Sequence, residues 1–119
     1  MGTSVDNDTP PSIQKLCNEI GATAAARVLV YALPRIRDLD RDLQALLLAG
    51  KRDAAAACAH RGLSSVRAYG TVQLEELLRQ VSSEEVDLHI ARAGLAAEFR
   101  SVINYVEDWL RRHDNMRHE

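Results

Sequence analysis

Apolar residues recur at intervals of three and four along most of this chain, the spacing that places them on one face of an α-helix. The pattern predicts a short helix over residues 12–20, a long helix over 23–49, and further helices over 53–69, 72–81 and 82–113. Gly21, Gly50 and Gly70 separate successive patterns, as expected for residues that end helices readily. Pro34 lies inside the long pattern and predicts either a bend or a split into two helices.

Three residues are expected to cap the starts of helices. Ser12 and Asp53 each stand just before an apolar pattern, and their side chains suit an N-cap. Ser82 and Glu85 have the spacing of a capping box, in which each side chain accepts a hydrogen bond from the other residue's backbone N–H. These residues therefore predict where the first, third and last of the long patterns become helical.

Short loops between long amphipathic helices favour antiparallel neighbours. The fold class expected is therefore all-α: an antiparallel up-down four-helix bundle with a short extra N-terminal helix as a lid. Residues 1–11 are polar, end in two prolines and read as a flexible leader or linker. Residues 12–113 form the helical domain, and residues 114–119 are expected to be a frayed tail.

Composition supports this interpretation and limits the partners. The chain has 119 residues, 46% of them hydrophobic and 4% aromatic, which suits a single domain of packed helices. A formal net charge of −2 leaves no broad basic surface, so nucleic acid is not an expected partner. Cys17 and Cys58 lie in helical patterns without metal-ligand spacing, and no carboxylate or ExxH arrangement predicts a metal site. Free buried thiols fit a cytoplasmic protein.

No apolar run approaches the roughly 20 residues that a membrane-spanning helix needs. We therefore expect no direct membrane contact. A cytoplasmic location is expected, with the chain either free or part of a membrane-anchored sensor kinase.

The alanine-rich third helix carries the candidate chemistry. Its core stripe is expected to consist of Ala55, Ala59, Gly62, Val66 and Tyr69. His60, Ser64 and Arg67 fall on a different stripe, which predicts a solvent-facing imidazole. A neutral imidazole nitrogen is a competent nucleophile near neutral pH, and the small Ser64 leaves room for an incoming group. Local context alone leaves two readings open: an ordinary exposed helical histidine, or a phosphoryl acceptor with Arg61 and Arg67 balancing the added charge.

The run AHRGLSSVRAYGTVQLEEL resembles the signature of bacterial histidine-containing phosphotransfer (HPt) domains, approximately A-H-x-L-K-G-S-x-x-x-L-G-A-x-x-L. The matching positions are Ala59, His60, Ser65, Tyr69, Gly70, Thr71 and Leu74. The likeness covers about residues 13–112. The chain departs from the signature at Gly62, Leu63 and Ser64, and Leu63 occupies the place of the family's lysine, which steadies the phosphoryl group.

The resemblance implies a phosphorelay intermediate in a two-component system. His60 would accept a phosphoryl group from an aspartate of a response-regulator receiver domain and pass it to another receiver. Arg61, Leu63, Ser64 and Arg67 would be the phosphoryl neighbours. The domain would not be an enzyme and would bind no cofactor of its own, since the partner receiver brings Mg²⁺.

Counting back from Gly50 along antiparallel helices places His60 level with Asp40. Receiver-docking contacts are therefore expected at Arg37, Asp40, Arg41 and Gln44. The alternative is an HPt-like helical docking or dimerisation module with weak or lost phosphotransfer. The missing lysine favours this alternative, and an exposed Leu63 would give it an apolar contact.

Overall fold

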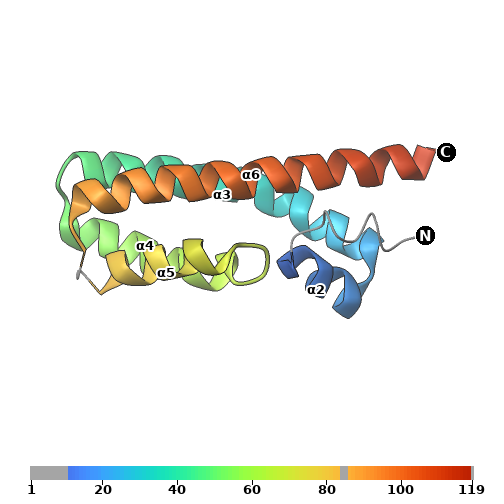
Figure 1. Cartoon of the computed structure of the whole chain (residues 1–119), viewed down its shortest axis with the longest axis horizontal. Helices are drawn as coiled ribbons and strands as arrows, with labels where there is room; N and C mark the ends of the chain where they lie inside the picture. Colours follow the sequence, from blue (N-terminus) through green and yellow to red (C-terminus); the bar gives the residue numbers. More distant parts are fainter. Residues whose placement is uncertain (1–10, 84–85, 119) are drawn as a thin grey trace.

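The computed structural model describes residues 11–83 and 86–118, with side chains as far as residue 113. The described residues are 88% helical and contain no strand. In chain order the helices are α2 (Pro11–Ile20), α3 (Ala22–Leu48), α4 (Arg52–Val66), α5 (Val72–Ser82) and α6 (Leu88–His118) (Figure 1). The all-α prediction is therefore confirmed. The leader expected at residues 1–11 falls outside the described residues except for Pro11.

Ser12 and Asp53 do not occupy the N-cap positions expected for them. Ser12 lies inside α2, and its hydroxyl donates to the carbonyl of Tyr69 at 3.0 Å instead of capping a helix. Asp53 lies within the first turn of α4, whose N-cap is Lys51. The carboxylate of Asp53 is still well placed for the positive end of the helix dipole.

The last helix begins later than the capping-box spacing predicts. Ser82 is the final residue of α5, and Glu85 lies outside the described residues. Asp87 provides the cap instead: its carboxylate accepts hydrogen bonds from the backbone N–H groups of His89 and Ile90 at 2.9 and 3.2 Å. A carboxylate that accepts two such bonds is a stronger start signal than a spacing pattern alone.

Pro34 does not split the long helix. α3 is continuous from Ala22 to Leu48 with Pro34 inside it. Leu29 and Ile36, on either side of the proline, are both completely buried. Packing on both sides holds the helix together across the missing backbone hydrogen bond.

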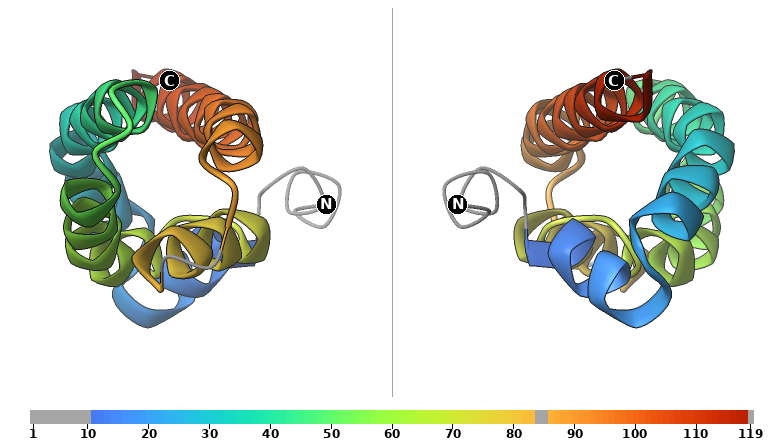
Figure 2. Two further views of the ribbon diagram at one scale, coloured as in Figure 1. Left: turned by 90° about the vertical axis from the view of Figure 1, so that its left-hand side faces the viewer. Right: turned by 90° about the vertical axis from the view of Figure 1, so that its right-hand side faces the viewer.

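Four helices surround the hydrophobic core. Viewed along the long axis, α3, α6, α5 and α4 follow one another around a central space that their side chains fill (Figure 2). α2 packs against α3 and lies beyond the turn that joins α4 to α5 (Figure 1). The carbonyl of Tyr69, in that turn, accepts hydrogen bonds from Ser12 of α2 and from the hydroxyl of Tyr105 of α6. A single carbonyl therefore joins three parts of the fold.

The turns rely on two glycines for different reasons. Gly50, between α3 and α4, has a φ of 70°, a conformation that other residues adopt at a cost. Gly70, between α4 and α5, has an ordinary φ, but a Cβ there would stand 2.8 Å from the carbonyl oxygen of Val66. The chain turns so closely after α4 that only hydrogen fits at this position.

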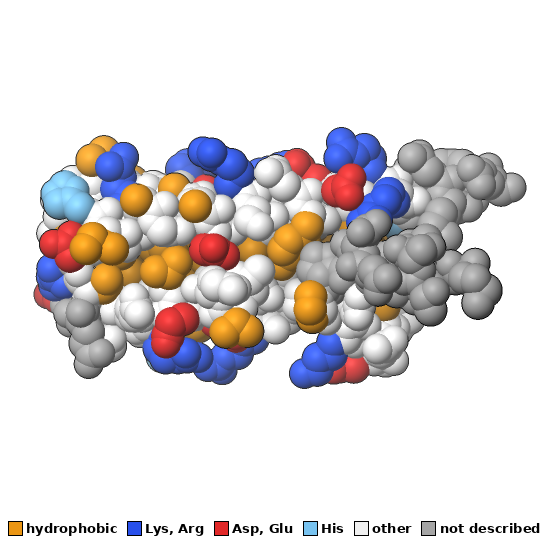
Figure 3. Space-filling view, viewed as in Figure 1, with side chains coloured by type: hydrophobic (Ala, Val, Ile, Leu, Met, Phe, Trp, Pro, Cys, Tyr) orange, Lys and Arg blue, Asp and Glu red, His pale blue; other side chains and the backbone are white. Residues whose placement is uncertain are grey.

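The surface is polar along the outer edges of the helices. Figure 3 shows charged side chains along the edges and hydrophobic side chains along the seam between α6 and α5. The fully buried set contains hydrophobic residues only, among those described. Within residues 11–83 and 86–118, every helix is too short or too polar to cross a membrane.

Candidate functional site

His60 lies on the outer face of α4. The predicted core stripe of this helix is confirmed, since Ala55, Ala59, Gly62 and Val66 are all buried. A Cβ on Gly62 would approach the two methyl groups of Leu39 to 2.6 and 2.8 Å, so α4 lies unusually close to α3 at this level. His60 itself is exposed, as predicted.

The stripe that carries His60 is turned toward α5. Arg67 follows His60 by seven residues, two turns on along the same stripe, and its Nε lies 3.6 Å from Oε1 of Glu75 in α5. Cys58 and Gly62 occupy the other side of α4, where Gly62 meets Leu39 of α3. The imidazole therefore projects near the outer edge between α4 and α5.

Two arginines flank His60 on different sides. Arg67 lies on the α5 side, in the ion pair with Glu75. Arg61 lies toward Cys58: burial raises the pKa of this thiol, the positive charge of Arg61 opposes the rise, and Asp42 of α3 adds to it. Both arginines are exposed and carry the positive charge predicted for the surroundings of the histidine.

Ser64 leaves the space above His60 open. It is exposed one turn after the histidine, and its hydroxyl points back to the carbonyl of Arg61 at 3.5 Å. A side chain this small, folded against its own helix, does not cover the imidazole.

Leu63 does not lie beside His60 on the surface. Its side chain is only 8% exposed and belongs to the hydrophobic core. A lysine at this position, as in the resembled family, could extend its charged end to solvent. The shorter side chain of leucine ends among apolar neighbours. The expected contact between Leu63 and a phosphoryl group or an apolar partner is therefore absent from the exposed surface.

Three of the four predicted docking residues face α6 instead of accompanying His60. Arg37 forms an ion pair with Glu107, and Gln44 donates to the backbone carbonyl of Arg92 at 3.1 Å. Burial raises the pKa of the Asp40 carboxyl, and the nearby positive charge of Arg100 in α6 opposes the rise. These contacts give the three side chains partners on α6, on the side of α3 away from α4.

Arg41, the fourth predicted docking residue, is exposed and pairs with Asp38 at 3.2 Å and with Asp42 at 3.3 Å. The count from Gly50 gave the correct level along the bundle axis, because Leu39 of α3 meets Gly62 of α4. The count did not give the rotation of α3 about its own axis. Each residue turns a helix by about 100°, so residues 37, 40 and 44 share one stripe. The tertiary packing directs that stripe toward α6.

Glu75, the partner of Arg67, is followed one turn later in α5 by Arg79, which pairs with Glu76 of the same helix at 3.3 Å. The spacing of Glu75 and Arg79 is visible in the sequence, whereas the pairing of Glu75 with Arg67 depends on the packing of α5 against α4.

Metal-binding geometry is not found among the described residues, where no three His, Cys, Asp or Glu side chains come together. Cys58 is buried and Cys17 half-buried, and both are free thiols whose pKa burial raises. A thiol with a raised pKa is a poor nucleophile near neutral pH. The chemistry of this face therefore centres on the imidazole.

Comparison of this chain with protein-family models, with curated proteins and with solved structures finds no match. The features of this chain that bear on function are the exposed imidazole of His60, its charged neighbours and the motif resemblance.

Proposed function

We propose that this chain is a phosphorelay intermediate: His60 accepts a phosphoryl group from a receiver-domain aspartate and passes it to a second receiver. The fold proposed with it is an antiparallel up-down four-helix bundle of the HPt type, with α2 as the short extra helix. The observation that carries the proposal is the exposed imidazole on α4, between Arg61 and Arg67, with only the small Ser64 one turn away. The spacing from His60 to Gly70 and the resemblance of residues 59–77 add to it.

The transfer is a nucleophilic displacement at phosphorus. A ring nitrogen of neutral His60 attacks the acyl phosphate, an N–P bond forms as the P–O bond breaks, and the aspartate carboxylate leaves. The return step reverses these changes on the second receiver. Arg61 and Arg67 offset the negative charge that remains on the histidine.

The partner supplies what this face lacks. Mg²⁺ and the acidic pocket belong to the receiver, so the chain is a carrier and not an enzyme in its own right. Docking is proposed across the outer edge of α4 and α5, which carries His60 and the Arg67–Glu75 ion pair. A patch of this size gives a weak, transient complex, which suits a carrier that must release each partner.

The decisive experiment is phosphoryl transfer from an isotopically labelled receiver. The full chain should acquire a label that is labile in acid and stable in base, and His60→Gln should acquire none. His89→Gln is the matched control, because His89 is also an exposed helical histidine. Label that persists in His60→Gln, or that never appears in the wild-type chain, overturns the proposal.

The second candidate is an HPt-like docking module with weak or lost transfer. The observation that favours it is the leucine at position 63, where the resembled family has its lysine. The burial of Leu63 removes one apolar contact that such a module would use beside the histidine. Receiver binding that is unchanged by His60→Ala, without phosphate uptake, distinguishes this candidate from the first.

A further inference from the structure

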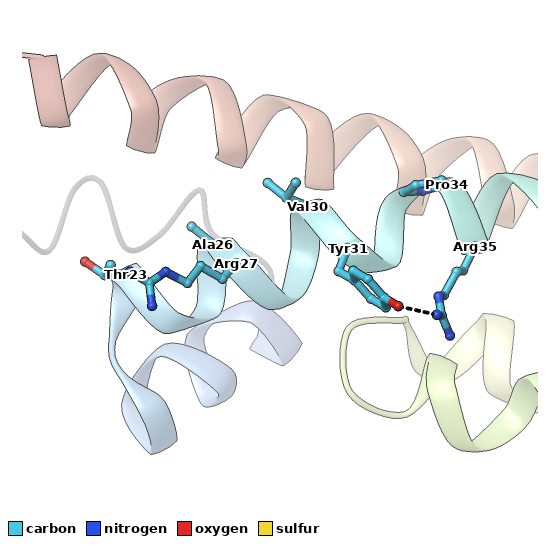
Figure 4. A pocket seen from close by; sticks show the side chains of 7 residues that line it. All are labelled: Thr23, Ala26, Arg27, Val30, Tyr31, Pro34 and Arg35. Atoms are coloured by element: carbon cyan, nitrogen blue, oxygen red, sulfur yellow. Dashed lines mark hydrogen bonds between the residues drawn. The ribbon is translucent and has the colours of Figure 1, made fainter.

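The N-terminal half of α3 is apolar on its outer face as well as its inner face. Leu29 is completely buried, yet its neighbours Val28, Val30 and Tyr31 are 40%, 60% and 67% exposed. The end of α4 reaches this part of α3 at Ser65, which lines a hollow with Val28 and Tyr31. Figure 4 shows Tyr31 and Arg35 projecting from α3 on the side of the turn that follows α4. A helix that is apolar all round is expected to be covered on all sides.

Two hollows adjoin this face, one on each side of Tyr31. The first, of about 550 Å³, lies on the outer face of α3 and is lined by Ala26, Val30 and Pro34. The second, of about 510 Å³, lies between α3 and the end of α4. Tyr31 is the ridge between the two hollows, and both offer mainly carbon atoms to an incoming side chain.

Arg27 and Arg35 line both hollows and provide a matched pair of charges. The guanidinium of Arg35 donates to the hydroxyl of Tyr31 at 2.7 Å and lies 4.4 Å from the centre of its ring. Neither arginine is paired with a carboxylate within residues 11–83 and 86–113. Eight residues separate the two, about 12 Å along the helix.

We propose that this face binds an acidic amphipathic helix of another protein. The partner places two carboxylates about two turns apart, one on Arg27 and one on Arg35, and inserts large apolar side chains on either side of Tyr31. The arrangement is a helix-against-helix contact bordered by charge-assisted hydrogen bonds. The charge pattern selects this occupant, because an apolar partner without carboxylates would desolvate both guanidinium groups and give neither of them an opposite charge.

Two other occupants fit less well. A second copy of this face would bring Arg27 and Arg35 against the same arginines. The chain's own residues 1–10 contain only two carboxylates, Asp6 and Asp8, which are two positions apart instead of two turns apart. The proposal does not depend on phosphoryl transfer, since it uses no residue of the His60 face.

The test uses the full chain and two labelled helical peptides of about 15 residues. One peptide carries two glutamates two turns apart with leucines between them, and the other has lysines in place of the glutamates. In fluorescence anisotropy the acidic peptide should bind and the basic one should not. Arg27→Glu combined with Arg35→Glu should weaken binding of the acidic peptide by at least about tenfold and should allow the basic peptide to bind.

Lys51→Glu is the control, an exposed charge reversal at the far end of α3 that should leave binding unchanged. Equal binding of both peptides, or no loss in the double variant, overturns the proposal. A dimer in sedimentation velocity that dissociates with Tyr31→Asp would show that a second copy occupies the face. Acidic-peptide affinity that rises at least about tenfold on removal of residues 1–10 would assign the face to the chain's own segment. Either result also overturns the proposal. Transfer to His60 should be unchanged in the double variant, which separates this test from that of the proposed function.

Discussion

The outer face of α4 and the outer face of the N-terminal half of α3 follow opposite rules. On α4 the inward residues are mostly small, with Leu63 the largest of them, and His60, Ser64 and Arg67 face solvent. On α3 the inward Leu29 is accompanied by outward Val30 and Tyr31. The two helices contribute to one core, so burial in this fold explains which residues lie on their inner faces. It does not explain the residues on the outer face of either helix.

The difference indicates two kinds of contact. A polar outer stripe with one imidazole suits brief chemistry with a partner that must leave again. An apolar stripe bordered by unpaired arginines suits a partner that remains bound, because its removal exposes carbon surface to water. Four changes, from the largest expected effect to the smallest, separate the roles of the two faces.

Replacing the imidazole should eliminate phosphoryl uptake while leaving the fold intact. His60→Gln changes an exposed side chain, so its thermal midpoint should match that of the wild-type chain. The incorporated label should fall to background, because no other group on this face is a competent nucleophile. A variant that loses both label and helicity would show that His60 has a structural role instead.

Truncating an inward residue of α3 should cost far more stability than truncating an outward one. Leu43→Ala empties a completely buried site and should lower the free energy of unfolding by about 2–5 kcal/mol. Val30→Ala should change it by less than about 0.5 kcal/mol. Urea unfolding followed by circular dichroism measures both. A large cost at Val30 would mean that this face is already covered within the chain.

High pH should weaken the fold through Tyr69. Burial raises the pKa of this phenol to about 12, with Tyr105 adding to the rise and Arg35 opposing it. The folded state therefore keeps a proton that the unfolded chain, with a pKa near 10, releases. Stability should be unaffected below about pH 10 and should fall between about pH 10 and 12, by on the order of 2 kcal/mol.

Tyr69→Phe is the matching variant, since it keeps the ring and removes the ionisable group. Its unfolding midpoint in urea, measured across that pH window, should decline less than that of the wild-type chain. A decline of equal size in both proteins would assign the alkaline sensitivity to other groups, of which Tyr105, whose pKa burial also raises, is the first to examine.

The smallest effect is expected at the ion pair beside His60. Arg67 and Glu75 are partly exposed at 3.6 Å, and a pair of this kind contributes about 0.2–1 kcal/mol. A double-mutant cycle with Arg67→Ala and Glu75→Ala measures the coupling. Arg67→Ala should also slow phosphoryl uptake measurably while changing stability by no more than this amount. Lys15→Ala, which removes an exposed cation from α2, should change neither the uptake rate nor the stability.

The two faces were not equally accessible from the sequence. The spacing of Ala55, Ala59, Gly62 and Val66 assigned the inward side of α4 correctly, and the exposure of His60 followed from it. Level along α3 alone predicts Arg37, Asp40 and Gln44 beside His60, but it does not give the rotation of the helix. The structure turns these three residues toward α6. The burial of Leu63 was not evident from the spacing either. Its side chain lies on the core side of α4, next to that of the stripe residue Gly62.

Local signals at the helix ends were also incomplete. Several residues can cap a helix, and which of them does so depends on where the neighbouring chain lies. Ser12 bonds to Tyr69, 57 residues away, because α2 packs beside that turn. Asp87 caps α6, a few residues beyond the serine that the capping-box spacing selected.

The sequence by itself determined that the chain is helical, where most of the helices lie and which side of α4 faces solvent, because helical periodicity is a local property. Only the tertiary structure decided which stripe of α3 meets α6, that Leu63 is buried, and that Val30 and Tyr31 on α3 stay exposed. Those outcomes depend on the distance and rotation between helices, which are set by contacts such as Gly62 against Leu39 that join residues far apart in the chain.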